Sequence, residues 1–289
     1  MPLTVLNRDP RQKSISSISF GIVLYETPES IIRELLQSLR SAILYLKTLR
    51  NDLDYTIFLI DNSKKTRVHD TCFEGEYDSM KKLKIGFDLI HGHGNVGYGS
   101  AHNLVIEQLA SDIHVILNPD VVIDERALLT VIDIFHNNRS VVMLSPSAIN
   151  SDGEKQYLCK YYPDILTLAI RAFIPSPLIS LFKKRLARYE MHDLPENKTS
   201  SDIPLVSGCC MFTDTKSLKQ AGGFDEGYFL YFEDFDLSIR IKKFGSLVYA
   251  PSVQIRHAGG QAARKGLRHI VLFARSGFRF FSLHGWRFN

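Results

Sequence analysis

An apolar run that ends abruptly in polar residues constrains the fold of this chain more than any other feature. Residues 113–117 read Ile-His-Val-Ile-Leu, and Asn118, Pro119 and Asp120 follow at once. Such a run is typical of a strand buried in a parallel sheet, and the proline ends it because it cannot donate a hydrogen bond to the sheet. Asp120 is therefore predicted at the carboxyl end of a buried strand, where open α/β sheets bind ligands. The alternative is that Asn-Pro-Asp is only a turn.

Strand and helix patterns alternate through the first half of the chain. Residues 19–25, 55–60 and 84–90 have the apolar pattern of strands. Residues 28–49 carry apolar side chains at helical spacing, and residues 100–109 predict a second helix. This alternation predicts an α/β fold with a mainly parallel sheet covered by helices.

A carboxylate follows a second predicted strand in the same way. Asp61 comes directly after residues 55–60, as Asp120 comes after the central strand. Mg²⁺ and Mn²⁺ prefer oxygen ligands and are often shared between carboxylates and substrate phosphates. Asp120 is therefore a candidate ligand for a divalent cation beside a phosphorylated ligand.

The loop at residues 91–103 contains four glycines, which allow positive φ angles or close approach of the backbone to a ligand. The spacing around Gly94, Gly97 and Gly99 is not that of a dinucleotide fingerprint, and no Gly-Lys-Ser/Thr ends the loop as in a P-loop. Two interpretations remain open: the loop touches a ligand, or it simply turns the chain.

The densest stretch of aromatic and acidic residues is predicted to open a helix. An aromatic run at residues 228–232 precedes Glu233, Asp234 and Asp236. Carboxylates at a helix amino terminus are stabilised by the helix dipole, so they are interpretable as caps. Aromatic walls also raise the basicity of a carboxylate and offer a platform for a sugar face, which suits a general base acting on a hydroxyl.

Composition indicates an ordinary intracellular globular protein. The net charge is +4, with 45% apolar and 23% charged residues, and no nucleic-acid-binding signature is present. Residues 1–19 lack the apolar core of a signal peptide, and the most apolar stretch, residues 165–182, is interrupted by arginine and proline. The cysteines lack metal-ligand spacing and are expected to be reduced and buried. They are Cys72, Cys159, Cys209 and Cys210.

Two basic segments and one histidine have alternative interpretations. Residues 160–203 hold prolines and a Lys-Lys-Arg cluster at 183–185, which predicts surface helices that are solvated or rest on an anionic membrane. Residues 256–289 contain seven Lys or Arg and no acidic residue, and the helix expected at 266–284 packs on the core or lies on a membrane. His257 is a satisfied histidine, a neutral metal ligand or a donor to phosphate.

Together these motifs resemble the family 2 glycosyltransferases, and most closely the bacterial rhamnosyltransferase branch that builds O-antigen, lipopolysaccharide and related cell-envelope polysaccharides. The resemblance covers residues 18–285. The motifs are Asp-Asn-Ser (61–63), Gly-Asn-Val-Gly-Tyr-Gly (94–99), Leu-Asn-Pro-Asp-Val (117–121), Gly-Gly-Phe-Asp-Glu (222–226) and Tyr-Phe-Glu-Asp-Phe-Asp-Leu-Ser-Ile-Arg (231–240).

This resemblance implies a GT-A fold, a nucleotide-sugar donor, a divalent cation (Mn²⁺ or Mg²⁺) and inversion at the anomeric carbon. It divides the chain into an N-terminal extension (1–17), a GT-A domain (18–260) and a basic aromatic helical tail (261–289). Within the domain, residues 18–123 are expected to bind the nucleotide, and residues 124–260 to hold the acceptor and the catalytic groups.

The resemblance also assigns roles to residues. Asp234 matches the catalytic base, with Glu233 beside it, and Asp120 and His257 are the expected metal ligands. Asn118 stands where the family's Asp-x-Asp motif has its first aspartate. The expected donor-binding residues are Tyr25, Glu26, Asp61, Asn95, Gly97, Asn103, Asn118 and Asp120. The residues expected on the acceptor side are Tyr231, Phe232 and Asp236.

The function implied is transfer of L-rhamnose from dTDP-rhamnose, with inversion, onto a lipid-linked glycan at the inner face of the cytoplasmic membrane. The protein is expected to be cytoplasmic, with peripheral membrane contact and no nucleic-acid partner. Alternatives are a UDP- or GDP-linked donor and a non-catalytic nucleotide- or carbohydrate-binding protein of the same fold. A nucleotidyltransferase is a further alternative, but residues 20–28 lack the glycine- and lysine-rich loop expected of that class.

Overall fold

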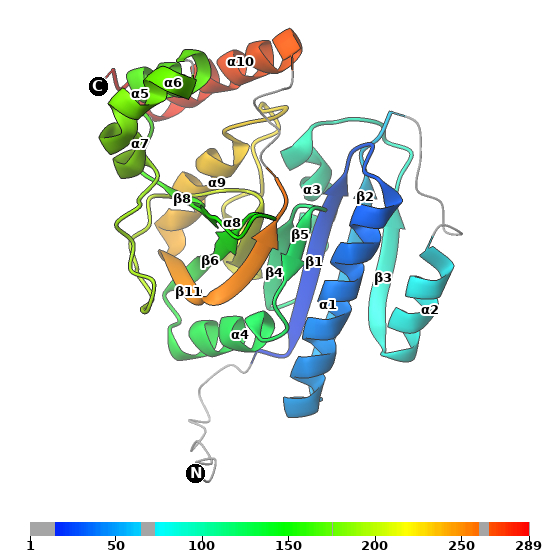
Figure 1. Cartoon of the computed structure of the whole chain (residues 1–289). Helices are drawn as coiled ribbons and strands as arrows, with labels where there is room; N and C mark the ends of the chain where they lie inside the picture. Colours follow the sequence, from blue (N-terminus) through cyan, green and yellow to red (C-terminus); the bar gives the residue numbers. More distant parts are fainter. Residues whose placement is uncertain (1–14, 65–72, 175, 260–265, 289) are drawn as a thin grey trace.

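A mixed β-sheet forms the centre of the protein, whose computed structural model describes residues 15–64, 73–174, 176–259 and 266–288. Figure 1 shows the sheet with helices on both faces and a further group of helices at one end. The strands are β1 (Ser17–Leu24), β2 (Asp54–Asp61), β3 (Ile85–Ile90), β4 (Ile113–Leu117), β5 (Val121–Ile123), β6 (Val141–Ile149), β7 (Lys155–Gln156), β8 (Cys159–Lys160), β9 (Leu205–Val206), β10 (Cys210–Asp214) and β11 (Ser246–His257). The α-helices are α1 (Glu29–Leu49), α2 (Glu74–Lys82), α3 (Tyr98–Ile106), α4 (Ala127–Asn137), α5 (Ile165–Phe173), α6 (Ser176–Ile179), α7 (Lys183–Tyr189), α8 (Thr215–Gln220), α9 (Glu233–Ile241) and α10 (Gly266–His284), with 3₁₀ turns η2 (Ser180–Phe182) and η3 (Lys242–Phe244).

In the part of the chain that the structure describes, nine strands form the central sheet, in the order β3-β2-β1-β4-β10-β6-β11-β5, with β7 paired to β6. The pairs among β1, β2, β3 and β4 are parallel, whereas β10 runs antiparallel between β4 and β6. The short strands β8 and β9 form a separate pair. The carboxyl ends of β1, β2 and β4 therefore meet at one edge, as expected for the mainly parallel sheet that the strand and helix alternation predicted.

Alternate side chains of β4 build the two faces of the core. Val115 and Leu117 pack in the cluster that contains α1 and α4, whereas Ile116 packs with residues of α3, α8 and α9. This alternation follows from the two-residue period of a strand. The result is a sheet between two helical layers, which confirms the predicted α/β architecture.

The long periodic segments were predicted well, and the short ones less so. The helices expected at 28–49 and 266–284 are α1 and α10. Helix α2 was not predicted, and β11 is one long strand with a register shift after Ala250. The predicted boundary between the nucleotide-binding part (18–123) and the acceptor and catalytic part (124–260) falls between β5 and α4. This division stays a prediction.

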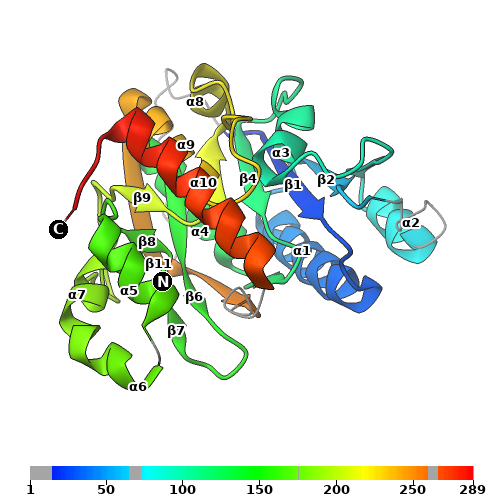
Figure 2. The ribbon, with the colours of Figure 1, turned by 90° about the horizontal axis from the view of Figure 1, so that it is seen from above.

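Helix α10 lies across the end of the molecule where the parallel strands finish (Figures 1 and 2). Phe280 and Phe281 pack with Tyr228 and Phe232, and Ile165 of α5 borders the same cluster. In the described ranges no helix has both the length and the apolar character to cross a membrane. Cys159, Cys209 and Cys210 are free thiols and buried, as predicted, while Cys72 and residues 1–14 and 260–265 lie outside the described residues.

Candidate active site

The turns after β1 and β2 are joined at the carboxyl edge of the sheet. Leu24 pairs with Asp61 in the parallel ladder, and the Asn62 backbone N–H donates to the Leu24 carbonyl at 2.8 Å. The Glu26 backbone N–H donates to Ser63 Oγ at 2.9 Å, and Asp61 Oδ1 accepts from the Ser63 N–H at 3.1 Å. The sequence-predicted residues Glu26 and Asp61 therefore belong to one structured edge, with Asp61 buried and the Tyr25 side chain exposed.

The glycine-rich loop is fixed in place by Asn62. Asn62 Oδ1 accepts from the Val96 N–H at 3.0 Å, and Asn62 Nδ2 donates to Asn95 Oδ1 and to the Gly97 carbonyl, each at 3.2 Å. Gly97 has φ +98°, and a Cβ there would lie 2.7 Å from the Phe229 carbonyl oxygen. The loop is therefore built around glycine at this position, pressed against the aromatic stretch that leads into α9.

Asn103 supports the site from the side of α3. Its Nδ2 donates to the Phe224 carbonyl at 2.9 Å and to Glu226 Oε1 at 3.1 Å, and its Oδ1 accepts from the Phe224 N–H at 2.9 Å. Both ends of the amide are therefore engaged by the loop that contains the Gly-Gly-Phe-Asp-Glu motif. Asn103 therefore links α3, which follows the glycine-rich loop, to the Gly-Gly-Phe-Asp-Glu motif, although the two segments are far apart in the sequence.

Asp120 and His257 come together although they are far apart in the sequence. Asp120 Oδ1 lies 3.4 Å from His257 Nε2, and the Ala258 N–H donates to the Asp120 carbonyl at 3.0 Å. His257 Nδ1 lies 2.8 Å from Gln156 Oε1, which orients the ring. Gln156 was not singled out in the sequence, because β7 has only two residues and no pattern.

This pair fits part of a divalent cation site. A carboxylate oxygen and an imidazole nitrogen suit Mn²⁺, and such ions usually complete their shell with water and substrate phosphates. Within the described residues, no group of three or more His, Cys, Asp or Glu side chains is arranged to hold a metal ion. Among the described His, Cys, Asp and Glu side chains, at most two would therefore bind one metal ion together. A bound nucleotide would have to supply further ligands.

The start of α9 places two carboxylates beside this edge. Tyr231 and Phe232 have φ angles of 72° and 66°, a left-handed conformation that is uncommon outside glycine. These two residues turn the chain so that the helix begins at Glu233. Asp234 Oδ2 then accepts from the Gly208 N–H at 2.8 Å, and its Oδ1 accepts from the Phe235 N–H at 2.9 Å.

Both carboxyl groups have raised pKa values. Burial is the main cause for each, and the charge of Asp234 raises the pKa of Glu233 further. Hydrogen bonds from the Gly208 and Phe235 N–H groups oppose the rise for Asp234. Glu233 is 5% exposed and its Oε2 has no hydrogen-bond partner among the described residues, whereas Asp234 is half-buried. Asp234 is thus the more accessible of two carboxylates with enhanced basicity.

Cys209 connects the Asn-Pro-Asp turn to Asp234. Its carbonyl accepts from the Asn118 N–H at 2.8 Å, and the preceding residue, Gly208, binds Asp234. Burial raises the pKa of the Cys209 thiol to about 12; a hydrogen bond with Ser207 opposes this, and the charges of Asp120 and Asp234 both add to it. The predicted metal ligand and the predicted base therefore both lie close enough to Cys209 for their charges to affect its thiol.

Lys160 is a site residue that sequence reasoning missed. Its ammonium is buried next to Glu190 at 3.4 Å, and burial lowers its pKa to about 8. Its charge is among the causes that lower the pKa of Asp234. The surrounding segment, 160–203, has little periodicity, so no sequence signal indicated that this lysine would affect the pKa of Asp234.

The expected acceptor-side residues divide into one accessible and two buried ones. Tyr231 is half-buried and its hydroxyl lies 2.9 Å from His269 Nδ1. Phe232 packs against Phe273 and Phe280 of α10. Asp236 is 1% exposed, and its carboxylate is bound by Arg240 Nε at 2.7 Å and by His284 Nε2 at 2.8 Å. Because Phe232 and Asp236 are buried, we do not expect them to contact the acceptor directly. Their contacts instead hold α10 against α9.

Residues 19–220 match the family model described as Glycosyl transferase family 2. The chain belongs to this family. The chain is 25% identical over 251 residues to N-acetylglucosaminyl-diphospho-decaprenol L-rhamnosyltransferase of Mycobacterium tuberculosis, with 81% of this chain and 76% of that protein covered. It is 24% identical over 247 residues to the rhamnosyltransferase WbbL of Escherichia coli, with 82% of this chain and 81% of that protein covered.

Solved structures support the GT-A fold of this family 2 glycosyltransferase. GalNAc-T7 with UDP, GalNAc and Mn²⁺ superposes with a TM-score of 0.60 at 15% identity, covering 94% of this chain and 48% of that one. The mannosyltransferase PcManGT of Pyrobaculum calidifontis, in complex with GDP-Man and Mn²⁺, gives 0.57 at 14% identity, with 91% of this chain and 64% of that one covered. The chain thus spans about half the length of GalNAc-T7. The expected fold, enzyme class and rhamnosyltransferase-like family branch are confirmed.

Proposed function

We propose that this glycosyltransferase moves L-rhamnose from dTDP-rhamnose, with inversion, onto a hydroxyl of a lipid-linked glycan in bacterial surface polysaccharide synthesis. The observation that carries the catalytic part is Asp234, a basic carboxylate at the start of α9, fixed by the Gly208 and Phe235 N–H groups. The names of the two rhamnosyltransferase relatives support rhamnose as the transferred sugar. The name of the Mycobacterium tuberculosis relative, which includes a diphospho-decaprenol, supports a lipid-linked acceptor.

In the proposed reaction, Asp234 accepts the proton of the attacking acceptor hydroxyl. The hydroxyl oxygen forms a bond to the anomeric carbon as the bond from that carbon to the diphosphate oxygen breaks, and attack from the opposite face inverts the configuration. General base catalysis of this kind contributes about 10²–10⁴-fold to the rate. Burial raises the pKa of Glu233, which favours its neutral form and so limits repulsion beside Asp234.

The departing nucleoside diphosphate carries negative charge that the site must stabilise. Asp120 and His257 are the residues that would hold a divalent cation, Mn²⁺ or Mg²⁺, and such an ion would neutralise the diphosphate as it leaves. We assign the base and ribose of the donor to the edge formed by Tyr25, Glu26 and Asp61. The Asn95 to Gly97 loop and Asn103 shape this edge through their contacts with neighbouring segments.

A thermal-shift series tests the donor assignment. The protein is heated with dTDP, UDP, GDP or CDP, each with and without Mn²⁺ or Mg²⁺. A ligand at 100 times its Kd stabilises the native state by about 2.7 kcal/mol, which corresponds to roughly 5–10 °C for a protein of this size. We expect a metal-dependent shift with dTDP that Asp120→Asn abolishes and the exposed control Asp193→Asn retains.

The other outcomes are equally informative. A shift with UDP or GDP alone would replace the dTDP assignment. Nucleotide binding without sugar transfer would favour a non-catalytic binding protein, and a shift that is independent of metal in both variants would remove the cation from the proposal.

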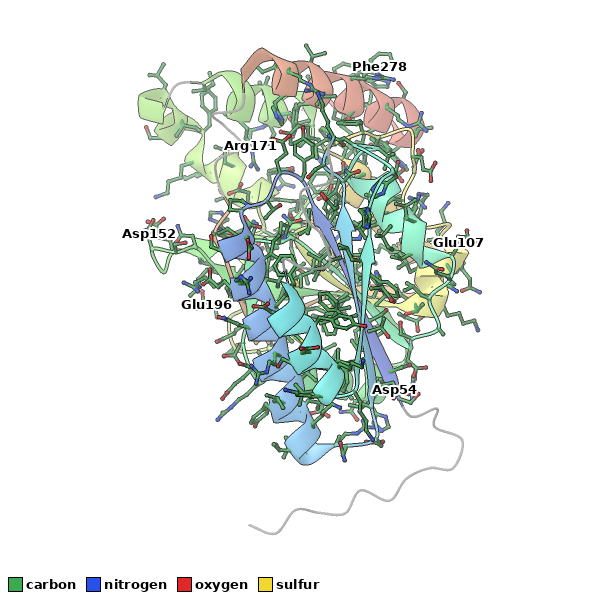
Figure 3. All side chains as sticks on the ribbon, turned by 90° about the vertical axis from the view of Figure 1, so that its right-hand side faces the viewer. Asp54, Glu107, Asp152, Arg171, Glu196 and Phe278 are labelled. Atoms are coloured by element: carbon green, nitrogen blue, oxygen red, sulfur yellow. The ribbon has the colours of Figure 1, made fainter. Side chains whose placement is uncertain are left out.

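We also propose peripheral contact with an anionic membrane through α10. Val271 and Phe278 are each 65% exposed, and Arg268 and Arg275 are exposed on the same helix. Figure 3 shows Phe278 at the outer surface, at the opposite end of the molecule from Asp54, the first residue of β2. Exposed apolar and basic side chains on one helix suit an interface between lipid headgroups and acyl chains.

Flotation with vesicles that contain phosphatidylglycerol tests this contact. We expect the double variant Val271→Glu/Phe278→Glu to lose most of the bound fraction, because each glutamate replaces apolar area with charge. The matched control is Leu49→Glu at the far end of α1, where the leucine is 56% exposed. Equal flotation of the α10 variant and the wild type would remove α10 from the proposal.

A further inference from the structure

A pocket of about 650 Å³ opens beside the C-terminal half of α9 and is lined by α5, α7 and the strand β9. Figure 1 shows α5 and α7 together at the end of the molecule where α10 lies. The volume is in the usual range for small-molecule sites. None of the predicted donor or metal residues lines this pocket, so it is separate from the edge that holds Asp61 and Asp120.

Cationic side chains dominate the charge of this pocket. Its lining contains one carboxylate, Asp164, and five cationic residues. These five are Arg185, Arg188, Lys242, Lys243 and Arg287. Like charges that share a pocket repel one another, and an anionic ligand would relieve that repulsion.

Most of this positive charge is not neutralised by the protein. Arg185 Nη2 donates to Asp164 Oδ1 at 2.7 Å, so Arg185 pairs with the one carboxylate among the lining residues named above. The guanidinium of Arg287 lies over the Tyr162 ring, 4.0 Å from its centroid, and this contact leaves the charge in place. Within the described ranges, the side chains of Arg188 and Lys243 have no ion-pair partner, so both can bind an anion.

The pocket wall is also apolar and aromatic. Tyr189, Leu205 and Ile239 line it together with the cations. A ligand that fills such a pocket combines an anionic group with an apolar portion. Arginine and lysine together are the usual protein partners of phosphate, arginine through its two-pronged geometry and lysine as a point charge.

The pocket is close to the proposed base. Ile239 follows Asp234 by five residues in the same helix, which is roughly 7.5 Å along the axis at 1.5 Å per residue. Burial raises the pKa of the Tyr189 hydroxyl and Arg171 lowers it, and the charge of Asp234 contributes a further rise. A sugar linked to a phosphate in the pocket would therefore lie in the direction of Asp234.

We propose that this pocket binds the phosphate or diphosphate group of an amphiphilic ligand, which for this enzyme is the phosphate-bearing part of a lipid-linked acceptor. Arg188 and Lys243 contact the phosphate oxygens, and Leu205 and Ile239 contact the apolar part. This inference rests on the proposed function, because it assigns the acceptor of the same transfer reaction.

Calorimetric titration of the full chain tests this site, with geranyl diphosphate, inorganic pyrophosphate and uncharged geraniol as probes and without divalent cation. We expect geranyl diphosphate to bind most tightly. The double variant Arg188→Gln/Lys243→Gln should weaken that binding by roughly tenfold or more, a change equivalent to about 1.4 kcal/mol. The matched control is Lys183→Gln/Lys184→Gln, which removes the same charge at exposed positions of α7 that do not line the pocket.

The comparison of probes distinguishes the source of the phosphate. Pyrophosphate that binds as tightly as geranyl diphosphate, with the same loss in the double variant, would support a phosphate site and remove the lipid from the assignment. Equal weakening in the two double variants, or no binding of either phosphate probe, would overturn the proposal. Nucleotide-dependent thermal shifts are measured in the same variants; if these persist while geranyl diphosphate fails to bind, only the pocket assignment is wrong.

Discussion

The two ends of α9 carry opposite charges and lie in different surroundings. Glu233 and Asp234 stand at its amino end, and Arg240, Lys242 and Lys243 stand at or just beyond its carboxyl end. The helix dipole favours both arrangements, so the signs of these charges alone do not indicate a function. The difference lies in burial: Glu233 is 5% exposed, whereas Lys242 and Lys243 are exposed at the mouth of a pocket.

This difference decides what each end can do. At the amino end, the dipole and local N–H groups lower the pKa of a carboxylate, yet the pKa values of both carboxyl groups are raised because burial dominates. A buried carboxylate with raised basicity suits proton transfer. At the carboxyl end, the lysines are exposed side chains that line a pocket, which suits binding of an anion. The two ends of α9 therefore suit two different chemical roles, although the helix dipole favours the charges at both ends.

The largest expected effect comes from Asp234→Asn. We expect the rate of sugar transfer to fall by about 10²–10⁴-fold, because the amide cannot accept the acceptor proton. The rate of the wild type should also fall on acidification at a pH above the ordinary aspartate pKa of about 3.9, since burial raises the pKa of Asp234. The measurement is kcat across pH, with thermal unfolding to verify folding.

The control for this variant is Asp193→Asn, which removes an exposed carboxylate that is not among the proposed site residues. It should retain the wild-type rate. A transfer rate within about tenfold of wild type for Asp234→Asn would rule out Asp234 as the base, since general base catalysis contributes more than that.

The next largest effect is expected in the middle of α9. Arg240→Met leaves the carboxylate of Asp236, which is 1% exposed, with His284 as its one remaining side-chain partner among the described residues. Removing one partner of a buried ion pair typically costs about 3–5 kcal/mol, so the melting temperature should fall by roughly 6–20 °C.

Arg256→Met serves as the matched control, because Arg256 and Glu34 form an exposed pair with side chains 45% and 50% exposed. Exposed pairs contribute about 0–1 kcal/mol. Similar melting temperatures for the two variants would contradict the structural role given to Asp236.

The smallest expected effect is a gain of stability from Glu233→Gln. The folded-state pKa of Glu233 is raised, so its favourable contribution is present at low pH and is lost as pH rises through that pKa. The neutral amide removes this loss, and we expect the melting temperature above neutral pH to rise by roughly 2–4 °C, equivalent to about 1 kcal/mol.

Scanning calorimetry between pH 5 and pH 9 measures this gain. The difference between the variant and the wild type should grow with pH, and the exposed control Glu125→Gln should show none. A variant that is destabilised equally at all pH values would show that the Glu233 carboxylate makes a favourable contact in the folded state.

Much of the fold could be predicted because its signals are local. Residues 113–117 and the following proline identified the central strand and its end, and helical periodicity identified α1 and α10. Helix α2 was missed because it is polar and short, with only Met80 buried among its described side chains. The antiparallel position of β10 between β4 and β6 could not be predicted from the sequence either, because strand pairing depends on segments that are far apart in the chain.

The sequence by itself determined the elements, the family motifs and the carboxylates at strand and helix ends, since these depend on spacing and on residue type. Only the tertiary structure decided which groups meet. It brought His257 to Gln156 and Asp120, placed Lys160 near Asp234, and used Asp236 to bind His284. The physical reason is that burial and electrostatic environment arise from contacts between residues far apart in the chain, so a carboxylate becomes a base or a structural anchor only when the chain has folded.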